Sequence, residues 1–182
     1  MDNKITIVID MQNGFAKEGN MYSSQVAQII PTVKEILENS KHKLFVLDSH
    51  HTGDLEMNLY PEHCIAGTWE ADVVDELAEY LNQENTYSVT KNITNAFFDI
   101  PGDLWEKYEI FEFVGCCTDI CVLQLLLTVK SYFNKREVTK PLIVYSNATA
   151  TYDDENHNAE EFKKYALAIM EQSGIEVKEW KK

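Results

Sequence analysis

The sequence predicts an α/β fold of three layers, in which a mostly parallel six-stranded sheet is flanked by helices. Two observations support this prediction. Short apolar runs rich in β-branched residues alternate along the chain with longer segments of helical hydrophobic periodicity. Such alternation is typical of parallel sheets, because a parallel crossover usually contains a helix. The length of 182 residues, 45% of them hydrophobic, suits a single globular domain spanning 1–182.

Each element follows from its local pattern. Runs of β-branched and aromatic residues predict strands over residues 4–10, 43–50, 87–91, 109–116, 141–147 and 175–180. Apolar residues at helical spacing predict helices between them, over residues 23–40, 70–83, 118–136 and 154–174. Pro31 inside the first of these helices predicts a kink or a restart near Ile30. In such a sheet any ligand is expected beyond the carboxyl ends of the strands.

The charge and composition exclude several classes of function. The formal net charge is −14, from 16 basic and 30 acidic residues, so nucleic acid would be repelled. The seven glycines form no dinucleotide-binding or phosphate-loop motif. Arg136 is the only arginine, which favours a small uncharged substrate unless the lineage simply prefers lysine. No apolar run has the length of a membrane span and the first residues lack a signal-peptide core, so we expect a cytoplasmic protein without a membrane partner.

Three of the four cysteines lie within six residues of each other, at Cys116, Cys117 and Cys121. In a reducing compartment all four are expected to be free thiols. Thr118 is a good N-cap for the following helix and places Cys121 in its first turn, where free backbone N–H groups favour a thiolate. Cys121 is therefore the predicted nucleophile. Cys116 and Cys117 end a predicted strand, where cysteines usually act as small buried apolar residues.

Two charged residues also end predicted strands. Asp10 ends the first strand and Lys91 closes the third, so both side chains are expected at the carboxyl edge of the sheet. Taken singly, an Asp after a strand is more commonly a turn or cap residue, and a lysine is more commonly solvated at the surface.

A second polar cluster surrounds residues 49–68, a segment with little periodicity that is long for a connection and is expected to be functional. Asp48 and His50 are two residues apart at a strand end, so their side chains point to the same side. Glu56 and His63 follow, which gives two carboxylates and two imidazoles of the kinds that bind zinc, manganese or iron. The spacing matches no stringent metal motif, and a polar loop without a metal is the alternative.

Together these segments resemble the isochorismatase-like cysteine hydrolases, and among them the nicotinamidase/pyrazinamidase branch. The resemblance spans the chain through "VIDMQNGF", "LDSHH", "YPEHCIAGT", "TKNITNAFF" and "GCCTDICV". It implies an isochorismatase-like, Rossmann-like fold and a catalytic triad of Asp10, Lys91 and Cys121. It also implies a cis peptide bond between Cys116 and Cys117, and an oxyanion hole formed by the backbone N–H groups of Cys117 and Cys121.

The same resemblance implies the ligands of one divalent metal ion, foremost zinc and otherwise manganese or iron, at Asp48, His50, Glu56 and His63. The substrate-binding positions correspond to Phe15, Tyr60 and Cys116. Phe15 and Tyr60 would enclose a ring, although each also suits an ordinary core aromatic. Nicotinamidases more often carry Val and Ala where this chain has Cys116 and Cys117. His157 matches a recurrent family histidine in the last long helix, with a structural role.

The function implied by the resemblance is hydrolysis of nicotinamide to nicotinate and ammonia through a thioester on Cys121, in NAD salvage. The substrate is then a small neutral amide, and the enzyme is expected to be a homo-oligomer. Two alternatives stay open. One is another amidohydrolase of the family that acts on a carbamoyl or ureido substrate with the same triad. The other is a thiol redox or sensing protein, in which Cys121 pairs with Cys117 or Cys116.

Overall fold

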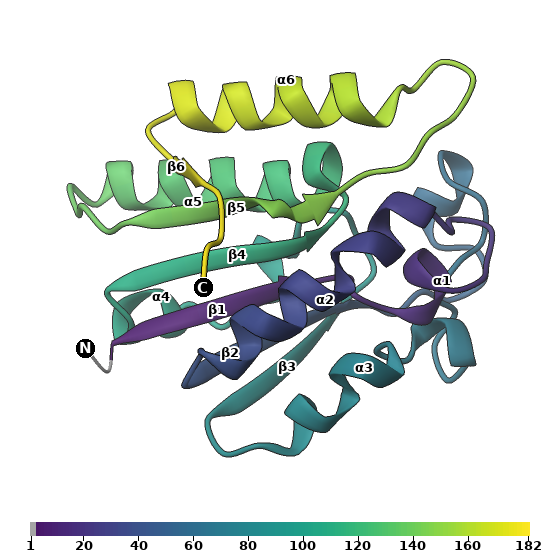
Figure 1. Cartoon of the computed structure of the whole chain (residues 1–182), viewed down its shortest axis with the longest axis horizontal. Helices are drawn as coiled ribbons and strands as arrows, with labels where there is room; N and C mark the ends of the chain where they lie inside the picture. Colours follow the sequence, from purple (N-terminus) through teal and green to yellow (C-terminus); the bar gives the residue numbers. More distant parts are fainter. Residues whose placement is uncertain (1–2) are drawn as a thin grey trace.

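The structure, a computed structural model, describes residues 3–182 and is built around one six-stranded sheet (Figure 1). The strand order is β3-β2-β1-β4-β5-β6, and all neighbouring strands of this described sheet run parallel. The strands are β1 (Lys4–Ile9), β2 (His42–Asp48), β3 (Thr86–Lys91), β4 (Ile110–Cys116), β5 (Leu142–Ala150) and β6 (Glu176–Lys178). All six overlap the predicted strands, so the α/β fold class is confirmed.

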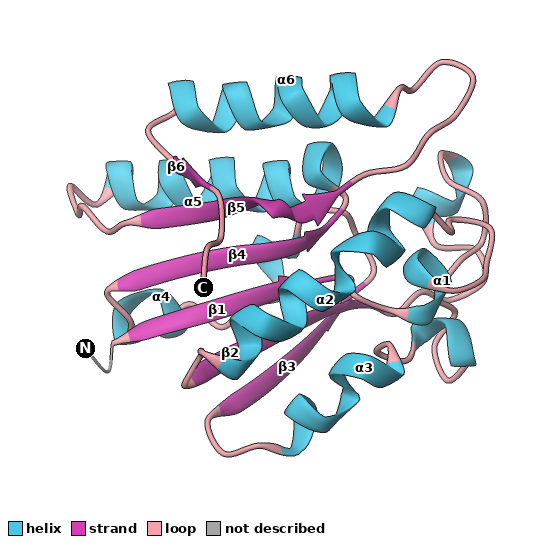
Figure 2. Ribbon diagram, viewed as in Figure 1, coloured by secondary structure: helices cyan, strands magenta, loops and turns pink. Residues whose placement is uncertain are grey.

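Helices cover both faces of the sheet and produce the three predicted layers (Figure 2). The α-helices are α1 (Asn13–Ala16), α2 (Ser24–Glu38), α3 (Asp75–Ala78), α4 (Leu104–Lys107), α5 (Leu123–Lys135) and α6 (Ala159–Gln172). Short 3₁₀ turns span Leu55–Asn58, Trp69–Ala71, Glu79–Asn82 and Ala96–Phe98, and a π-helical turn spans Thr118–Val122. One buried apolar cluster joins the sheet to α4, α5 and α6, and a second joins it to α1, α2 and α3. The hydrophobic core is thus divided between the two faces.

The predicted restart at Pro31 is wrong, because α2 continues through this residue as one helix. Its buried side, from Val26 to Leu37, faces the sheet, whereas Pro31 lies exposed on the opposite side. Proline has no N–H group, so the carbonyl group one turn earlier lacks its helical hydrogen bond. On this exposed side of α2, water can replace that bond.

The single helix predicted over residues 70–83 is also wrong. The segment instead forms a 3₁₀ turn, three extended residues at 72–74, the short α3 and a second 3₁₀ turn. Backbone groups of residues 72–74 bond to residues 11–13, with N–H to carbonyl distances of 2.9 and 3.1 Å. These tertiary hydrogen bonds compete with helix formation and outweigh the local propensity.

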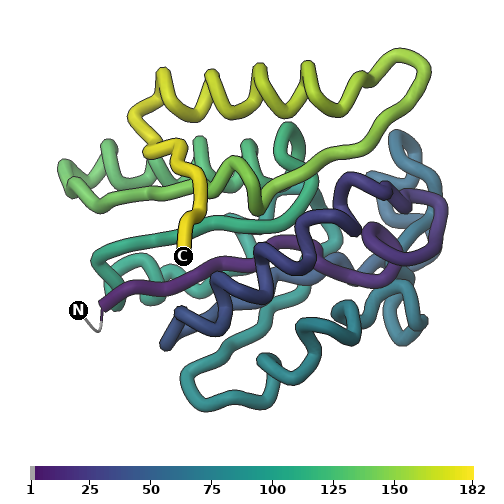
Figure 3. Tube along the Cα trace, viewed as in Figure 1, coloured from purple at the N-terminus to yellow at the C-terminus, as the bar shows by residue number. Residues whose placement is uncertain are grey.

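The topology places several strand ends side by side. β1 lies between β2 and β4, although the purple β1 and the teal β4 are far apart in the sequence (Figure 3). The chain adds β2 and β3 on one side of β1 and β4 to β6 on the other, which makes the boundary between β1 and β4 a topological switch point. Ligands of open α/β sheets bind at this kind of position, beyond the carboxyl ends of the strands.

None of the helices within residues 3–182 combines the length and the apolar character needed to cross a membrane.

Candidate active site

Three charged or nucleophilic side chains meet at the carboxyl edge of the sheet. Lys91 Nζ lies 3.0 Å from Asp10 Oδ2 and 3.7 Å from Cys121 Sγ. All three residues are buried, with 8% or less of their surface exposed. They come from the ends of β1 and β3 and from the turn after β4, so the structure brings together the acid, the lysine and the cysteine expected from the sequence.

Lys91 also forms an ion pair with Asp48, which links the first cluster to the second. The two residues are direct neighbours in the parallel register of β2 and β3. Burial alone would lower the pKa of Lys91, but the carboxylates of Asp10 and Asp48 raise it well above its usual value. Lys91 is therefore a permanent ammonium that neutralises part of the charge of two buried acids.

Asp10 has the protonation behaviour of a general base. Burial and the neighbouring Asp48 raise its pKa to about 7, and the Lys91 ammonium limits this rise. Its Oδ1 atom is buried and has no hydrogen-bond partner among residues 3–182, which leaves an acceptor free for a ligand. A carboxyl group with a pKa near neutrality can accept and return a proton under physiological conditions.

Cys121 is a thiol rather than the predicted thiolate. Burial raises its pKa well above the usual value, and Lys91 opposes this effect only in part. The start of a helix favours a thiolate, but the cost of burying the charge outweighs this effect. Cys121 therefore needs a base to take its proton, and Asp10 contacts the same Lys91 ammonium and lines the same pocket.

The turn that carries Cys121 begins with a cis peptide bond between Cys116 and Cys117, which confirms the expectation from the resemblance. Gly115 precedes it with φ of 115°, and a Cβ atom there would collide with the carbonyl oxygen of Ile9 in β1. Only glycine fits this close approach of two strands. The Cys117 carbonyl then accepts hydrogen bonds from the amides of residues 120 and 122, at 3.1 and 3.2 Å.

The helix start after this turn differs from the prediction. Cys117, not Thr118, is the N-cap residue, and its side chain makes no capping hydrogen bond. Thr118 is buried, and its hydroxyl group has no hydrogen-bond partner in the described part of the chain. Residues 118–122 form a π-helical turn that leads into α5. π turns are rare and are frequent at functional sites. Here the turn carries Cys121 on a wider spiral than the regular helix that the sequence predicts.

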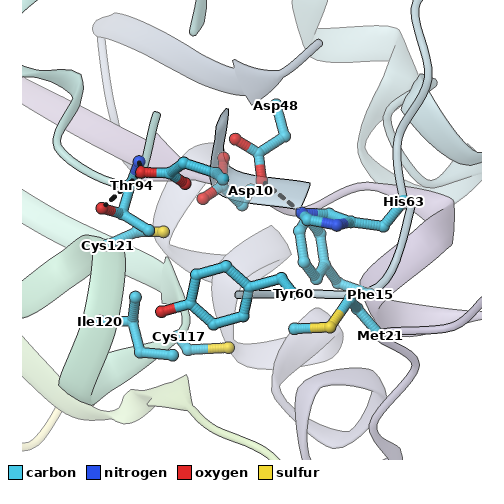
Figure 4. Close-up of a pocket in the computed structure, with 11 residues that line it drawn as sticks. Asp10, Phe15, Met21, Asp48, Tyr60, His63, Thr94, Cys117, Ile120 and Cys121 are labelled. Atoms are coloured by element: carbon cyan, nitrogen blue, oxygen red, sulfur yellow. Dashed lines mark hydrogen bonds and ion pairs between the residues drawn. The ribbon is translucent and has the colours of Figure 1, made fainter. Parts of the chain in front are cut away.

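A pocket opens over the Asp10 and Cys121 side chains (Figure 4). Phe15, Tyr60 and Cys117 line it, as expected for substrate-binding positions and the oxyanion turn. Its remaining lining residues are Met21, Asp48, Glu56, His63, Thr94 and Ile120. In Figure 4 the Tyr60 ring lies between Ile120 and Cys117 on one side and Phe15 and His63 on the other. The pocket thus combines an apolar, partly aromatic wall with a titratable floor.

Cys116 is the one predicted substrate contact that the structure does not bring to this pocket. Its side chain is fully buried, and its Sγ donates a hydrogen bond to the backbone carbonyl of Asp10, at 3.2 Å. Burial raises the pKa of Cys116 well above its usual value. Of the two neighbouring cysteines, only Cys117 lines the pocket.

Asp48, His50 and His63 form a group suited to a metal ion, because one ligand atom from each lies within 4.8 Å of the others. His63 Nδ1 is 2.7 Å from the Pro61 carbonyl, which can only accept, so this nitrogen carries the hydrogen. The other ring nitrogen, Nε2, faces Asp48 Oδ2 at 3.4 Å and is the atom available to a metal ion. Burial would raise the pKa of Asp48, but Lys91 and the two histidines hold it below the usual range. An ionised Asp and two buried imidazoles fit a divalent metal ion.

Glu56, the fourth predicted ligand, is not part of this group. It lines the pocket, but its carboxylate accepts hydrogen bonds from the Thr94 amide at 2.9 Å and the Thr94 hydroxyl at 3.2 Å. Glu56 lies in a 3₁₀ turn of the loop, and this contact fixes the loop against the end of β3.

Several lining residues were not found from the sequence. Met21 lies in a loop, Thr94 follows β3, and Ile120 lies in the π turn. Their residue types give no local signal of binding. Only Thr94 could have been noticed, because it follows a strand end within the segment "TKNITNAFF".

Comparison with known proteins agrees with this arrangement. Residues 4–181 match the Isochorismatase domain family. Nicotinamidase 1 of Arabidopsis thaliana is 29% identical over 182 residues, which cover 86% of this chain and 73% of that protein. The isochorismatase family protein PncA of Bacillus subtilis (strain 168) is 30% identical over 171 residues, which cover 85% and 90%. The crystal structure of nicotinamidase PncA from Bacillus subtilis has a TM-score of 0.77 and 25% identity, and covers 98% of this chain and 100% of that one. This chain belongs to the isochorismatase family.

Proposed function

We propose that the protein is a nicotinamidase, which hydrolyses nicotinamide to nicotinate and ammonia through a thioester on Cys121. The observation on which this depends is the contact of Lys91 with both Asp10 and Cys121, two residues that line one pocket. Relatives named nicotinamidases support the choice of substrate. A neutral aromatic amide also suits a pocket whose wall contains Phe15, Met21 and Tyr60.

In the first half of the reaction, Cys121 Sγ attacks the amide carbon while the thiol proton moves to Asp10. Lys91 remains an ammonium beside both groups and stabilises the negative charge that passes between them. The amide oxygen becomes an oxyanion, for which the backbone N–H groups of Cys117 and Cys121 are the proposed donors. Asp10 then gives its proton to the leaving nitrogen, so ammonia departs and a thioester remains.

In the second half, water attacks the thioester carbon and loses a proton to Asp10. The oxyanion forms again at the same N–H groups, the C–S bond breaks, and the Cys121 sulfur regains its proton from Asp10. The new carboxylic acid loses its proton to solvent, so nicotinate leaves as an anion. The pKa of about 7 for Asp10 suits a group that must act alternately as base and acid.

Asp48, His50 and His63 are the proposed ligands of a divalent ion, for which zinc is the first choice and manganese or iron the alternatives. When bound, such an ion supplies a Lewis-acid contact that orients the substrate in the pocket. We keep Glu56 as a proposed additional ligand, although it bonds Thr94 here. A homo-oligomeric state and a cytoplasmic location also remain proposals.

The test is ammonia release from nicotinamide by the purified, metal-supplemented protein. A variant with Cys121→Ala is the matched control, because it removes the nucleophile and should retain the fold. We expect release by the intact protein and a loss of at least about 10³-fold in the variant. No release from nicotinamide, together with hydrolysis of a carbamoyl or ureido compound, would assign the protein to another amidohydrolase reaction. Full activity of the variant would refute the thioester mechanism.

A further inference from the structure

His157 makes an unusually complete set of contacts outside the pocket. It lies in the loop before α6, not inside the last helix as expected from the sequence. Its ring is enclosed by Tyr152, at a centroid distance of 4.0 Å, and by Phe162, at 3.9 Å. Its Nε2 atom is 2.7 Å from Asp119 Oδ2, and its Nδ1 atom is 2.8 Å from the Tyr152 carbonyl. Both ring faces and both ring nitrogens are thus occupied.

These contacts fix the orientation of the ring. A backbone carbonyl can only accept a hydrogen bond, so Nδ1 donates to the Tyr152 carbonyl. Nε2 lies within hydrogen-bond distance of the Asp119 carboxyl group. Both members of this pair are close to nine-tenths buried, with side-chain exposures of 12% for His157 and 11% for Asp119.

The partner of His157 is part of the turn that carries the nucleophile. Asp119 lies in the π-helical turn, two residues before Cys121. Within the turn, the amides of residues 120 and 122 bond to the Cys117 carbonyl. The Asp119 side chain connects the turn to the loop before α6. A π turn holds one residue more than an α turn, so relaxation toward α geometry would change the direction of Cys121.

We propose that His157 is a positioning residue for Cys121, which holds the nucleophile turn in place through its hydrogen bond with Asp119. The proposal rests on the proposed function, because it assigns a residue to the same reaction. His157 does not line the pocket, so it should affect the acyl-transfer step and not the binding of the substrate. Small displacements of a nucleophile reduce rates strongly even where the binding contacts remain.

The test is a double-mutant cycle with His157→Ala, Asp119→Ala and the double variant. The readouts are kcat and KM for nicotinamide, measured per folded molecule below the unfolding temperature of each variant. We expect each single change to lower kcat by about tenfold or more, with KM changed by less than about twofold. The double variant should be no worse than either single one, because both remove the same contact. Glu155→Ala, an exposed change in the same loop, is the matched control and should leave both constants unchanged.

A second assay separates this proposal from the choice of substrate. Acylation of Cys121 by p-nitrophenyl acetate, followed as a burst of p-nitrophenol with Cys121→Ala as the blank, does not require nicotinamide to be the substrate. If nicotinamide is not hydrolysed but acylation slows about tenfold in His157→Ala, the proposed function fails and the positioning role stands. His157→Gln, whose amide N–H group can still donate to Asp119, should recover part of the rate and serves if the alanine variant does not fold. Additive effects in the cycle, or an acylation rate that is independent of His157, would overturn the proposal.

Discussion

Replacement of Lys91 by methionine should move the pH dependence of the reaction. Met has nearly the length of the lysine side chain without its charge. In the intact protein Asp10 has a pKa of about 7, because burial and Asp48 raise it and Lys91 lowers it. Since the reaction needs ionised Asp10 in the free enzyme, kcat/KM should rise with pH through about 7 and then level off. Removal of the ammonium leaves only the two causes that raise this pKa.

The size of the shift follows from the distance. Two unit charges at 3.0 Å, the separation of Lys91 Nζ and Asp10 Oδ2, interact by about 5 kcal/mol at an effective dielectric constant of about 20. If half of this survives water penetration and rearrangement, the pKa of Asp10 rises by about two units. The ionised fraction at about pH 7.5 then falls from about three quarters to about 3%, so kcat/KM should fall by about 25-fold there.

The assay is the initial rate of ammonia release between about pH 5.5 and about pH 9.5, with circular dichroism at each pH to confirm the fold. Lys164→Met is the matched control, because Lys164 is exposed on α6 and its loss should leave the profile unchanged. In Lys91→Met the rising limb should lie near pH 9, and activity should partly return at alkaline pH. An unchanged limb with a uniformly lower rate would show that Asp10 is not the group whose ionisation Lys91 controls.

Three further predictions concern the metal group and the fold. Treatment with a chelator, or His50→Ala, should abolish stoichiometric metal in elemental analysis and raise KM by about tenfold or more. Undiminished metal content in the variant would contradict the ligand assignment. Gly115→Ala should lower the free energy of unfolding by about 3 kcal/mol or more in urea titrations, because the new Cβ atom would collide with β1. Near-native stability would be incompatible with so close an approach of β1 and β4 at that position. Tyr145→Phe should cost about 2 kcal/mol by the same measurement, because the hydroxyl lies 2.6 Å from the buried Glu112 carboxylate, and the exposed Tyr165→Phe should cost almost nothing.

The sheet could be predicted from the sequence because its signal is local. β-branched runs such as residues 4–10 and 109–116 have few alternatives to a buried strand, and parallel strands collect their carboxyl ends at one edge. That geometry is enough to place Asp10 and Lys91 at the same edge, whereas their grouping with Cys121 was predicted from the resemblance and is present in the structure. The cis bond came only from the resemblance, since no local pattern in the residues announces it.

The features that were missed depend on register and on tertiary contacts. The pairing of Asp48 with Lys91 follows from the alignment of β2 with β3, which separate strand patterns do not reveal. The extended residues 72–74 follow from hydrogen bonds to a loop some sixty positions away, and the protonated state of Cys121 follows from burial. Each of these effects is exerted by parts of the chain that a short window cannot include.

The strand order has a consequence for how this protein can be altered. The reacting groups arrive from β1, β3 and the turn after β4, so no contiguous fragment shorter than most of the chain contains them all. Enzymatic turnover should therefore report whether the four adjoining strands β3, β2, β1 and β4 have assembled, while the short edge strand β6 on the other side could loosen without abolishing turnover. New chain termini would accordingly be placed best at the opposite rim, in the exposed turn between α5 and β5, which is remote from the carboxyl edge.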